Sequence, residues 1–267
     1  MKKHNLLILL LLMSVTVVAQ KKPKIKGNKV VTNVYQSLEG FSSIEIGDDL
    51  SVDITQSETI GYHLKTDKNL IDIIKFENVA GTLKIYTTKK ITSSKKLEIN
   101  LNFRNIHSIV LKDNAQLTSM NKLNFSKLSF SALDNSTYDA TFVFDSSSSG
   151  ELIVQGEYAT MILNENAHLK GDIELEKLEL SVNKRAYLNL KGEATILKLT
   201  ATGSSNIKAK ELITTFAELS ASNSSDIYVN ASKALKLYAE GSSYVYVYGS
   251  PEITVDGLND KSQLIKK

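Results

Sequence analysis

A repeat of about 20 residues dominates the sequence between Ile109 and Val247. Stretches that alternate apolar and polar residues each run into a short polar segment. The clearest stretches are Leu178-x-Leu180-x-Val182, Leu197-x-Leu199-x-Ala201, Ala217-x-Leu219-x-Ala221 and Leu235-x-Leu237-x-Ala239. The polar segments that follow are Lys184-Arg185-Ala186, Gly203-Ser204-Ser205, Asn223-Ser224-Ser225 and Gly241-Ser242-Ser243. Strand-type alternation that recurs at a fixed spacing is typical of a solenoid, in which each unit packs on its neighbours.

The repeat allows equivalent positions in successive units to be aligned. The first residues of successive polar segments are placed at Asp113, Asp134, Glu165, Lys184, Gly203, Asn223 and Gly241. A coil of about 20 residues at about 3.3 Å per residue has a contour of about 66 Å, which suffices for two or three short strands. We therefore predict an all-β fold, a parallel β-helix in which inward residues form columns. These are Leu178, Leu197, Ala217 and Leu235 in one column, and Leu180, Leu199, Leu219 and Leu237 in the next.

One interval breaks the repeat. The spacing between Asp134 and Glu165 is 31 residues, whereas the other spacings lie between 18 and 21. The segment from Phe142 to Val154 falls in this interval. Its pattern is compatible with an extra hairpin that protrudes from the stack or with a degenerate coil, and both alternatives stay open.

The chain divides into five regions. A secretory signal peptide is predicted over residues 1–19. It shows basic residues within Met1–Asn5, then the apolar run Leu6–Met13, then small residues ending at Ala19. Residues 20–29, rich in lysine, are expected to form a disordered leader. Alternating strands predict a β-rich cap region over residues 30–104, followed by the β-helix repeats over 105–247 and a C-terminal cap and tail over 248–267.

Composition narrows the possible partners. The chain has no cysteine, so it can form neither a disulfide nor a lipid-modified N-terminal cysteine. Removal of the signal peptide takes away Lys2 and Lys3 and lowers the formal net charge from +3 to +1, which argues against nucleic acid as a partner. The sequence contains no second long apolar run, so no transmembrane segment is predicted. We expect an exported protein in the periplasm, on the outer cell surface or secreted.

The sequence shows little that indicates catalysis. His63, His107 and His168 are widely separated, so no metal or cofactor site is predicted. Asp113, Asp134 and Glu165 share one position in successive units and could form an acidic column that binds a cation or a sugar. The same position becomes glycine or asparagine further along. We therefore interpret it as a solvated corner, with the acidic column as a weak candidate site.

Tyrosines give the better functional indication. Tyr228, Tyr244, Tyr246 and Tyr248 crowd the last two units, and three of them alternate along one predicted strand. A flat array of tyrosines can stack on sugar rings or bury itself in a protein partner. Alternatively, this face packs under the C-terminal segment. The sequence favours neither alternative.

The chain resembles a known family of secreted bacterial proteins, those with the auto-transporter adhesin head domain, also called the GIN domain. The resemblance covers about residues 30–257. The segments that carry it are Phe41–Ile46, Leu50–Gln56, Asn69–Leu70, Gly81–Ile85, the Leu-x-Leu-x-Ala-x-Gly-Ser-Ser coils and Tyr248–Glu252. It implies a right-handed β-helical fold, export to the cell envelope and an adhesive role.

These observations lead to one main hypothesis and two alternatives. The main hypothesis is a non-enzymatic envelope protein whose β-helix binds carbohydrate or a surface protein. The first alternative is a carbohydrate-active enzyme similar to β-helical polysaccharide lyases, which requires a groove of clustered acids and bases. The second is a surface scaffold that self-associates through its coil ends or its tyrosines.

Overall fold

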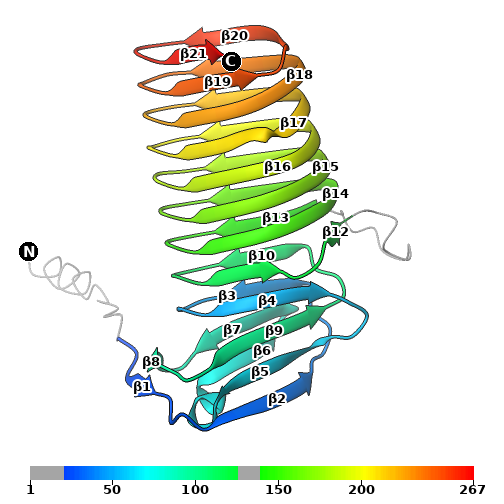
Figure 1. Cartoon of the computed structure of the whole chain (residues 1–267), viewed down its shortest axis with the longest axis vertical. Helices are drawn as coiled ribbons and strands as arrows, with labels where there is room; N and C mark the ends of the chain where they lie inside the picture. Colours follow the sequence, from blue (N-terminus) through cyan, green and yellow to red (C-terminus); the bar gives the residue numbers. More distant parts are fainter. Residues whose placement is uncertain (1–20, 126–138) are drawn as a thin grey trace, which may run out of the picture.

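The computed structural model describes residues 21–125 and 139–267 and shows a tall stack of flattened coils (Figure 1). The fold is nearly all-β, with parallel strands stacked into a solenoid, which confirms the predicted fold class. The elements are β1 (Lys24–Lys26), β2 (Val31–Ser37), β3 (Ser43–Ile46), β4 (Ser51–Gln56), β5 (Gly61–Asp67), the 3-10 helix η1 (Lys68–Ile73), β6 (Ile74–Val79), β7 (Thr82–Thr87), β8 (Lys90–Ser93), β9 (Leu97–Phe103), β10 (Ser108–Leu111), β11 (Gln116–Ser119), β12 (Leu123–Phe125), β13 (Asp139–Phe144), β14 (Ser149–Leu163), β15 (His168–Val182), β16 (Tyr187–Ala201), β17 (Asn206–Ala221), β18 (Asp226–Ala239), β19 (Tyr244–Tyr248), β20 (Glu252–Leu258) and β21 (Gln263–Lys266).

The long strands β14 to β18 each make most of one coil. The first half of each strand follows a tight turn and forms the first side of the solenoid. The chain then bends, and the second half forms the opposite, second side. Inward residues of both halves meet in one continuous core. Leu178 pairs with Leu197 and Leu180 with Leu199 in adjacent coils, and all four are at most 4% exposed, which confirms the predicted inward columns.

The tight turns also stack into a column. Each contains a residue with positive φ, from Asp113 (57°) through Glu165 (60°) to Asp260 (58°). Gly203 has a φ of 75°, and a Cβ there would lie only 2.6 Å from the backbone of Lys184, so glycine relieves both the strain and the close approach. The local geometry explains why this position recurs every coil.

One residue of the predicted register is wrong. Ser146, with a φ of 57°, occupies the turn between those of Asp113 and Glu165. The Ser147 N–H donates to the Asp113 carbonyl at 2.9 Å, and the Asn166 N–H donates to the Ser146 carbonyl at 2.8 Å. Asp134, which the sequence placed at this position, lies outside the described residues. Both candidates follow alternating stretches, and only the strand pairing distinguishes them.

The irregular interval from Phe142 to Val154 forms a coil and not a protruding hairpin. β13 pairs in parallel with both β10 and β14, and β14 begins after the tight turn at Ser146. Phe142, Phe144 and Val154 are at most 1% exposed and add to the core. The additional length of this coil falls between β12 and β13, outside the described part of the chain.

The N-terminal end is interleaved. β3 lies between β7 and β10, and β4 lies between β9 and β11, all in parallel. The coil made by β3 and β4 therefore separates two coils that come later in the sequence (Figure 1). β5 pairs antiparallel with β2 and β9, and β6 pairs antiparallel with β7. The region expected to be a cap, residues 30–104, thus contributes solenoid coils as well as capping strands.

Two further expectations at the chain ends need correction. The leader is ordered, because β1 pairs in parallel with β8 and the Gly27 N–H donates to the Ser93 carbonyl at 2.8 Å. The C-terminal segment, expected to be a cap and tail, makes one more coil, in which β20 pairs with β18 and β21 pairs with β19. Pro251 precedes β20 and so does not interrupt this pairing.

Two predictions concern the membrane. The predicted signal peptide, residues 1–19, lies outside the described residues. Within residues 21–125 and 139–267, no helix is long and apolar enough to span a membrane.

Candidate binding surface

The four predicted tyrosines lie together on the first side of the solenoid, near its C-terminal end. β18 carries Tyr228, and β19 carries Tyr244, Tyr246 and Tyr248. The alternating residues of both strands, such as Val245 and Val247, point inward and are fully buried. The apolar core therefore fixes the tyrosines outward, where each is half-buried. We call this set the tyrosine face.

Parallel pairing brings the tyrosine rings into contact. Tyr228 and Tyr246 are directly paired, and their rings stack with centroids 4.5 Å apart and an interplanar angle of 10°. The Tyr244 ring lies 6.5 Å from that of Tyr246, at 17°. Lys267 places its Nζ 5.4 Å from the centroid of the Tyr246 ring. The result is a face-to-face stack of Tyr228 on Tyr246, with a cation over the Tyr246 ring and Tyr244 beside it.

Burial alters the chemistry of Tyr228. Its partial burial, with the adjacent Tyr246, Asp226 and Tyr248, raises the pKa of the Tyr228 hydroxyl above 10.0. Burial also raises the pKa of the Asp226 carboxyl. The Tyr228 hydroxyl is thus protonated at neutral pH and can donate a hydrogen bond to a ligand.

The C-terminal segment leaves the tyrosine face open. β21 pairs edge to edge with β19, so that Ile265 lies beside Tyr246 in the same sheet and not over it. The segment therefore adds a strand beside the tyrosines and forms no second layer over them, but its last residue, Lys267, places its Nζ over the Tyr246 ring. Partial burial of the tyrosines comes from their own stacking and from neighbours on adjacent strands.

The aromatic surface extends further along the first side than the sequence analysis indicated. Tyr187 follows its turn by three residues, as Tyr244 does, and its ring centroid lies 5.7 Å from that of His168. Lys208 places its Nζ 5.4 Å from the Tyr187 centroid. A shallow hollow of about 280 Å³ adjoins this pair, and Glu151 and Lys170 contribute to its lining. The constant distance from the turn is the signal that could have identified Tyr187.

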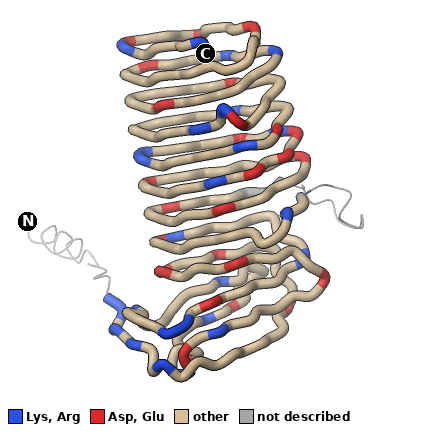
Figure 2. Tube along the Cα trace, viewed as in Figure 1, with Lys and Arg blue, Asp and Glu red and all other residues tan. Residues whose placement is uncertain are grey.

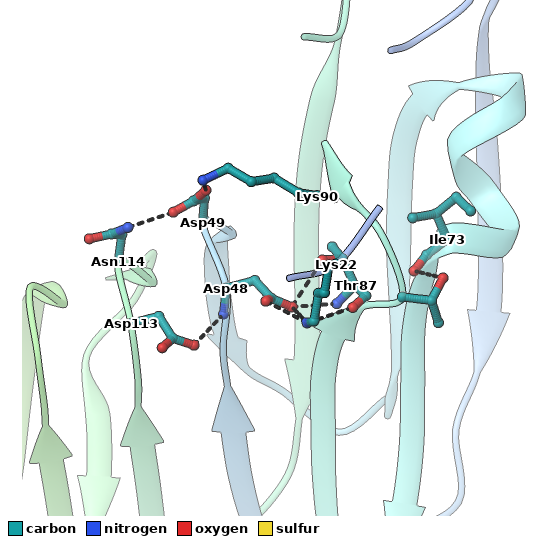
Figure 3. Close-up of polar contacts among 9 residues, drawn as sticks. Lys22, Asp48, Asp49, Ile73, Thr87, Lys90, Asp113 and Asn114 are labelled. Atoms are coloured by element: carbon teal, nitrogen blue, oxygen red, sulfur yellow. Dashed lines mark hydrogen bonds and ion pairs between the residues drawn. The ribbon is translucent and has the colours of Figure 1, made fainter. Parts of the chain in front are cut away.

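The two described members of the acidic column, Asp113 and Glu165, do not come together. Asp113 lies at the interleaved end, where its Oδ2 accepts the N–H of Asp48 at 3.0 Å (Figure 3). Asp48 in turn binds Lys22, Nζ to Oδ1 at 2.6 Å, and accepts the Thr87 N–H at 2.7 Å. Burial opposes ionisation of Asp48, but the Lys22 and Thr87 contacts hold its pKa below 3.8. Asp113 thus helps to tie three stacked segments together.

Glu165, the other described member of that column, forms an ion pair with Lys184 of the next coil. Ser146 separates its turn from that of Asp113, so the two carboxylates do not share one site. No cluster of three or more histidine, aspartate or glutamate side chains within the described residues could hold a metal ion. Acidic residues gather instead at the bend of the middle coils (Figure 2). Glu157, Glu174 and Glu193 line a hollow of about 470 Å³.

The structure defines a class, the repeat proteins of the β-solenoid type, in which each coil packs on its neighbours; here one side carries outward tyrosines. Comparison with known families agrees with this class. Residues 40–251 match the family described as "Putative auto-transporter adhesin, head GIN domain". The chain therefore belongs to this family, which confirms the resemblance found in the sequence.

Solved structures share the fold. A "putative adhesin" from Parabacteroides distasonis superposes with a TM-score of 0.80 at 15% identity, covering 91% of this chain and 100% of the other. A "putative adhesin" from Parabacteroides merdae gives 0.79 at 16% identity, covering 92% and 99%. A "putative lipid binding protein" from Parabacteroides distasonis gives 0.78 at 19% identity, covering 91% and 99%. No curated protein matches the chain. At these identities the likeness shows the fold alone.

Proposed function

We propose that this protein is an exported, non-enzymatic adhesin of the cell envelope that binds carbohydrate on its tyrosine face. The observation that carries the proposal is the stack of Tyr228 on Tyr246, in register and open to solvent, with Tyr244 beside it. The stacked tyrosines offer both apolar ring surface for a sugar ring and hydroxyl groups for its polar rim. Membership of an adhesin family supports this role.

Lysine side chains beside the tyrosines favour a ligand with acidic groups. Lys267 lies over Tyr246, and Lys208 lies over Tyr187 on the same side. A sugar that carries carboxylate or sulfate groups would gain charge-assisted hydrogen bonds from these ammonium groups while its rings stack on the tyrosines. An extended acidic glycan lying along the solenoid axis would contact both aromatic groups.

A panel of neutral and acidic glycans tests the proposal. We expect an acidic glycan to bind, and the Tyr246→Ala variant to bind it about tenfold more weakly, since a buried aromatic anchor contributes more than 1 kcal/mol. Tyr35→Ala is the matched control, because Tyr35 is 76% exposed on the distant β2 and should leave affinity unchanged. Equal affinity of Tyr246→Ala and the unmodified protein would contradict carbohydrate binding at this face.

The panel also tests a protein ligand. If no glycan binds but a surface protein is captured, and Tyr246→Ala loses that capture, the tyrosine face binds protein instead.

Export is tested separately. The protein recovered from the cell envelope should begin at Gln20, and a cytoplasmic protein that keeps Met1 would contradict export.

A further inference from the structure

The second side of the solenoid carries an exposed apolar patch that the proposed function does not use. Ile196 on β16 and Phe216 on β17 are paired in adjacent coils and are 43% and 45% exposed. They line a shallow hollow of about 420 Å³, to which Lys198 and Glu218 also contribute. An apolar pair of this size in the middle of a regular sheet side is a candidate for burial by a partner.

A row of alternating charges runs beside this patch. The row reads Glu179, Lys198, Glu218, Lys236 on four successive coils. Each member lies beside the next in the strand register, so the charges follow the solenoid axis as minus, plus, minus, plus. We call this row the charge ladder.

The charge ladder is complementary to its own reverse. Consider two copies placed face to face and related by a two-fold axis that runs parallel to the strands and passes between β16 and β17. This axis reverses the order of the coils, so each column of one copy faces the same column of the other copy in reverse order. In that arrangement Glu179 of one copy faces Lys236 of the other, and Lys198 faces Glu218. The same operation sets Ile196 against Phe216. We propose that the second side of β15 to β18 binds a second copy of this chain in an antiparallel, face-to-face dimer.

The next outward column permits close approach. Ser181, Thr200 and Ser220 follow the charge ladder on β15, β16 and β17, each two residues further along its strand. These short hydroxyl side chains leave room on β15 to β17. On β18 the same column carries Tyr238, which pairs with Ser220, is 38% exposed and faces Ser181 of the second copy across the two-fold axis. Two copies can therefore approach until the apolar pairs and the opposite charges come into contact, with this large side chain set opposite a small one.

The size of the patch sets the strength of the dimer. Four coils spaced about 4.8 Å apart and half-strands of about seven residues give a footprint of about 440 Å² per copy. A stable interface of standard size buries about 800 Å² per partner. The dimer is therefore reversible and should be populated only at high protein concentration. It leaves the tyrosine face of each copy outward and does not depend on the proposed ligand.

Charge reversal tests the arrangement. The purified protein is compared by sedimentation equilibrium over a concentration series with Lys198→Glu, with Glu218→Lys and with the double variant. Each single reversal places like charges opposite each other and should raise the dissociation constant about tenfold or more. The double variant restores opposite charges across the two-fold axis, so the dimer should return.

The double variant also separates a dimer from a purely intramolecular role of the charge ladder. Within one copy it changes the row to minus, minus, plus, plus, which creates two like-charged neighbours. Each single reversal also leaves two like-charged pairs and one opposite pair along the row. If the charges only stabilise the monomer, the double variant therefore melts no higher than the single variants and restores no association, which overturns the proposal. A wild-type protein that stays monomeric at millimolar concentration overturns it as well.

Removal of the apolar contact gives an independent test. Phe216→Ser should abolish association while leaving the melting temperature nearly unchanged, because Phe216 is already 45% exposed in the single chain. Val79→Ser is the control, since Val79 is 52% exposed on β6 of the N-terminal end and lies outside the proposed interface. Dimerisation that survives Phe216→Ser would overturn this assignment of the surface.

Discussion

The two ends of the solenoid are built by different rules. At the C-terminal end each coil pairs with the coils before and after it in the sequence, from β14 through β18 to β20 and β21. At the N-terminal end the coil of β3 and β4 is held between strands that come later, and antiparallel strands cover the end. The C-terminal coils can therefore be added or lost in order, whereas the N-terminal coils form only together.

This difference has a consequence for stability. Stacked repeats gain their stability from nearest neighbours, so the outermost coils of a sequential stack can open without the rest. An interleaved end has no coil that can leave alone, because removing β3 from between β7 and β10 breaks two ladders at once. We expect the N-terminal end to unfold as one unit and the C-terminal end to fray.

The largest expected effect comes from matched core truncations at the two ends. Ile44 on β3 and Ile227 on β18 are both fully buried. An isoleucine to alanine change in a core costs about 2–5 kcal/mol. Ile44→Ala should lower the free energy of unfolding of the whole protein. Backbone amides throughout the N-terminal coils should then lose their protection from hydrogen exchange. Ile227→Ala should lose amide-exchange protection mainly in residues 226–267.

Native-state hydrogen exchange of both variants measures this difference. Equal spreading of the lost protection in the two variants would show that interleaving does not couple the N-terminal coils. A confined loss in Ile44→Ala would show that the sequential stack is the more cooperative end.

The same contrast explains what could be predicted from the sequence. Inward columns such as Leu180 and Leu199 follow from alternation plus a fixed period, because parallel in-register stacking places equivalent residues above one another. The outward position of Tyr246 follows from the same alternation. Where the chain stacks in order, the repeat thus predicts both the fold and the candidate site.

Interleaving was beyond such prediction. Phe41–Ile46 shows a strand pattern, but nothing in its residues specifies β7 and β10 as neighbours of β3, since both pairings are made far along the chain. The structural use of Asp113 depends on this non-local arrangement too. Similarly, Ser146 and Asp134 both follow alternating stretches, and the pairing of β13 alone decides which one enters the turn column.

A second prediction concerns the buried carboxylate that holds the N-terminal end. Asp67 is buried at the end of β5 and accepts the N–H groups of Lys29 at 2.9 Å and of Lys95 at 3.2 Å. Burial opposes its ionisation, but these backbone donors, with that of Lys96 and the Lys95 charge, hold its pKa below 3.8. The lowered pKa means that the stabilisation is present above 3.8 and is lost as the pH falls through the lower folded-state pKa.

Asp67→Asn should therefore lower the melting temperature at pH 7 by several degrees, because the amide group is a weaker acceptor and turns a donor toward other donors. The difference from the unmodified protein should shrink as the pH falls toward 3. Asp72→Asn, at an exposed acid of η1, is the control and should melt like the unmodified protein. A pH-independent difference would show that the Asp67 charge does not hold this end.

The smallest effect is expected in the buried column beside the tight turns, which also differs between the two ends. It begins with Leu50 and Ala115 and ends with serines such as Ser205 and Ser243. The Ser243 hydroxyl donates to the Glu240 carbonyl at 2.7 Å, whereas that of Ser205 is buried and finds no partner among the described residues. Ser243→Ala should cost about 0.5–1.5 kcal/mol, and Ser205→Ala should be neutral or stabilising by up to about 1 kcal/mol.

Chemical denaturation measures the free energy of unfolding of the two serine variants. Both variants place an alanine in a column where alanine already occurs at Ala115. Equal losses in both would mean that the Ser205 hydroxyl is satisfied in solution. A gain at Ser205 would show that the C-terminal coils carry a removable cost that the N-terminal end lacks, because an unpaired buried hydroxyl opposes folding and a methyl group in its place does not. Removing that cost should reduce fraying of the sequential end, and so make the two ends more alike.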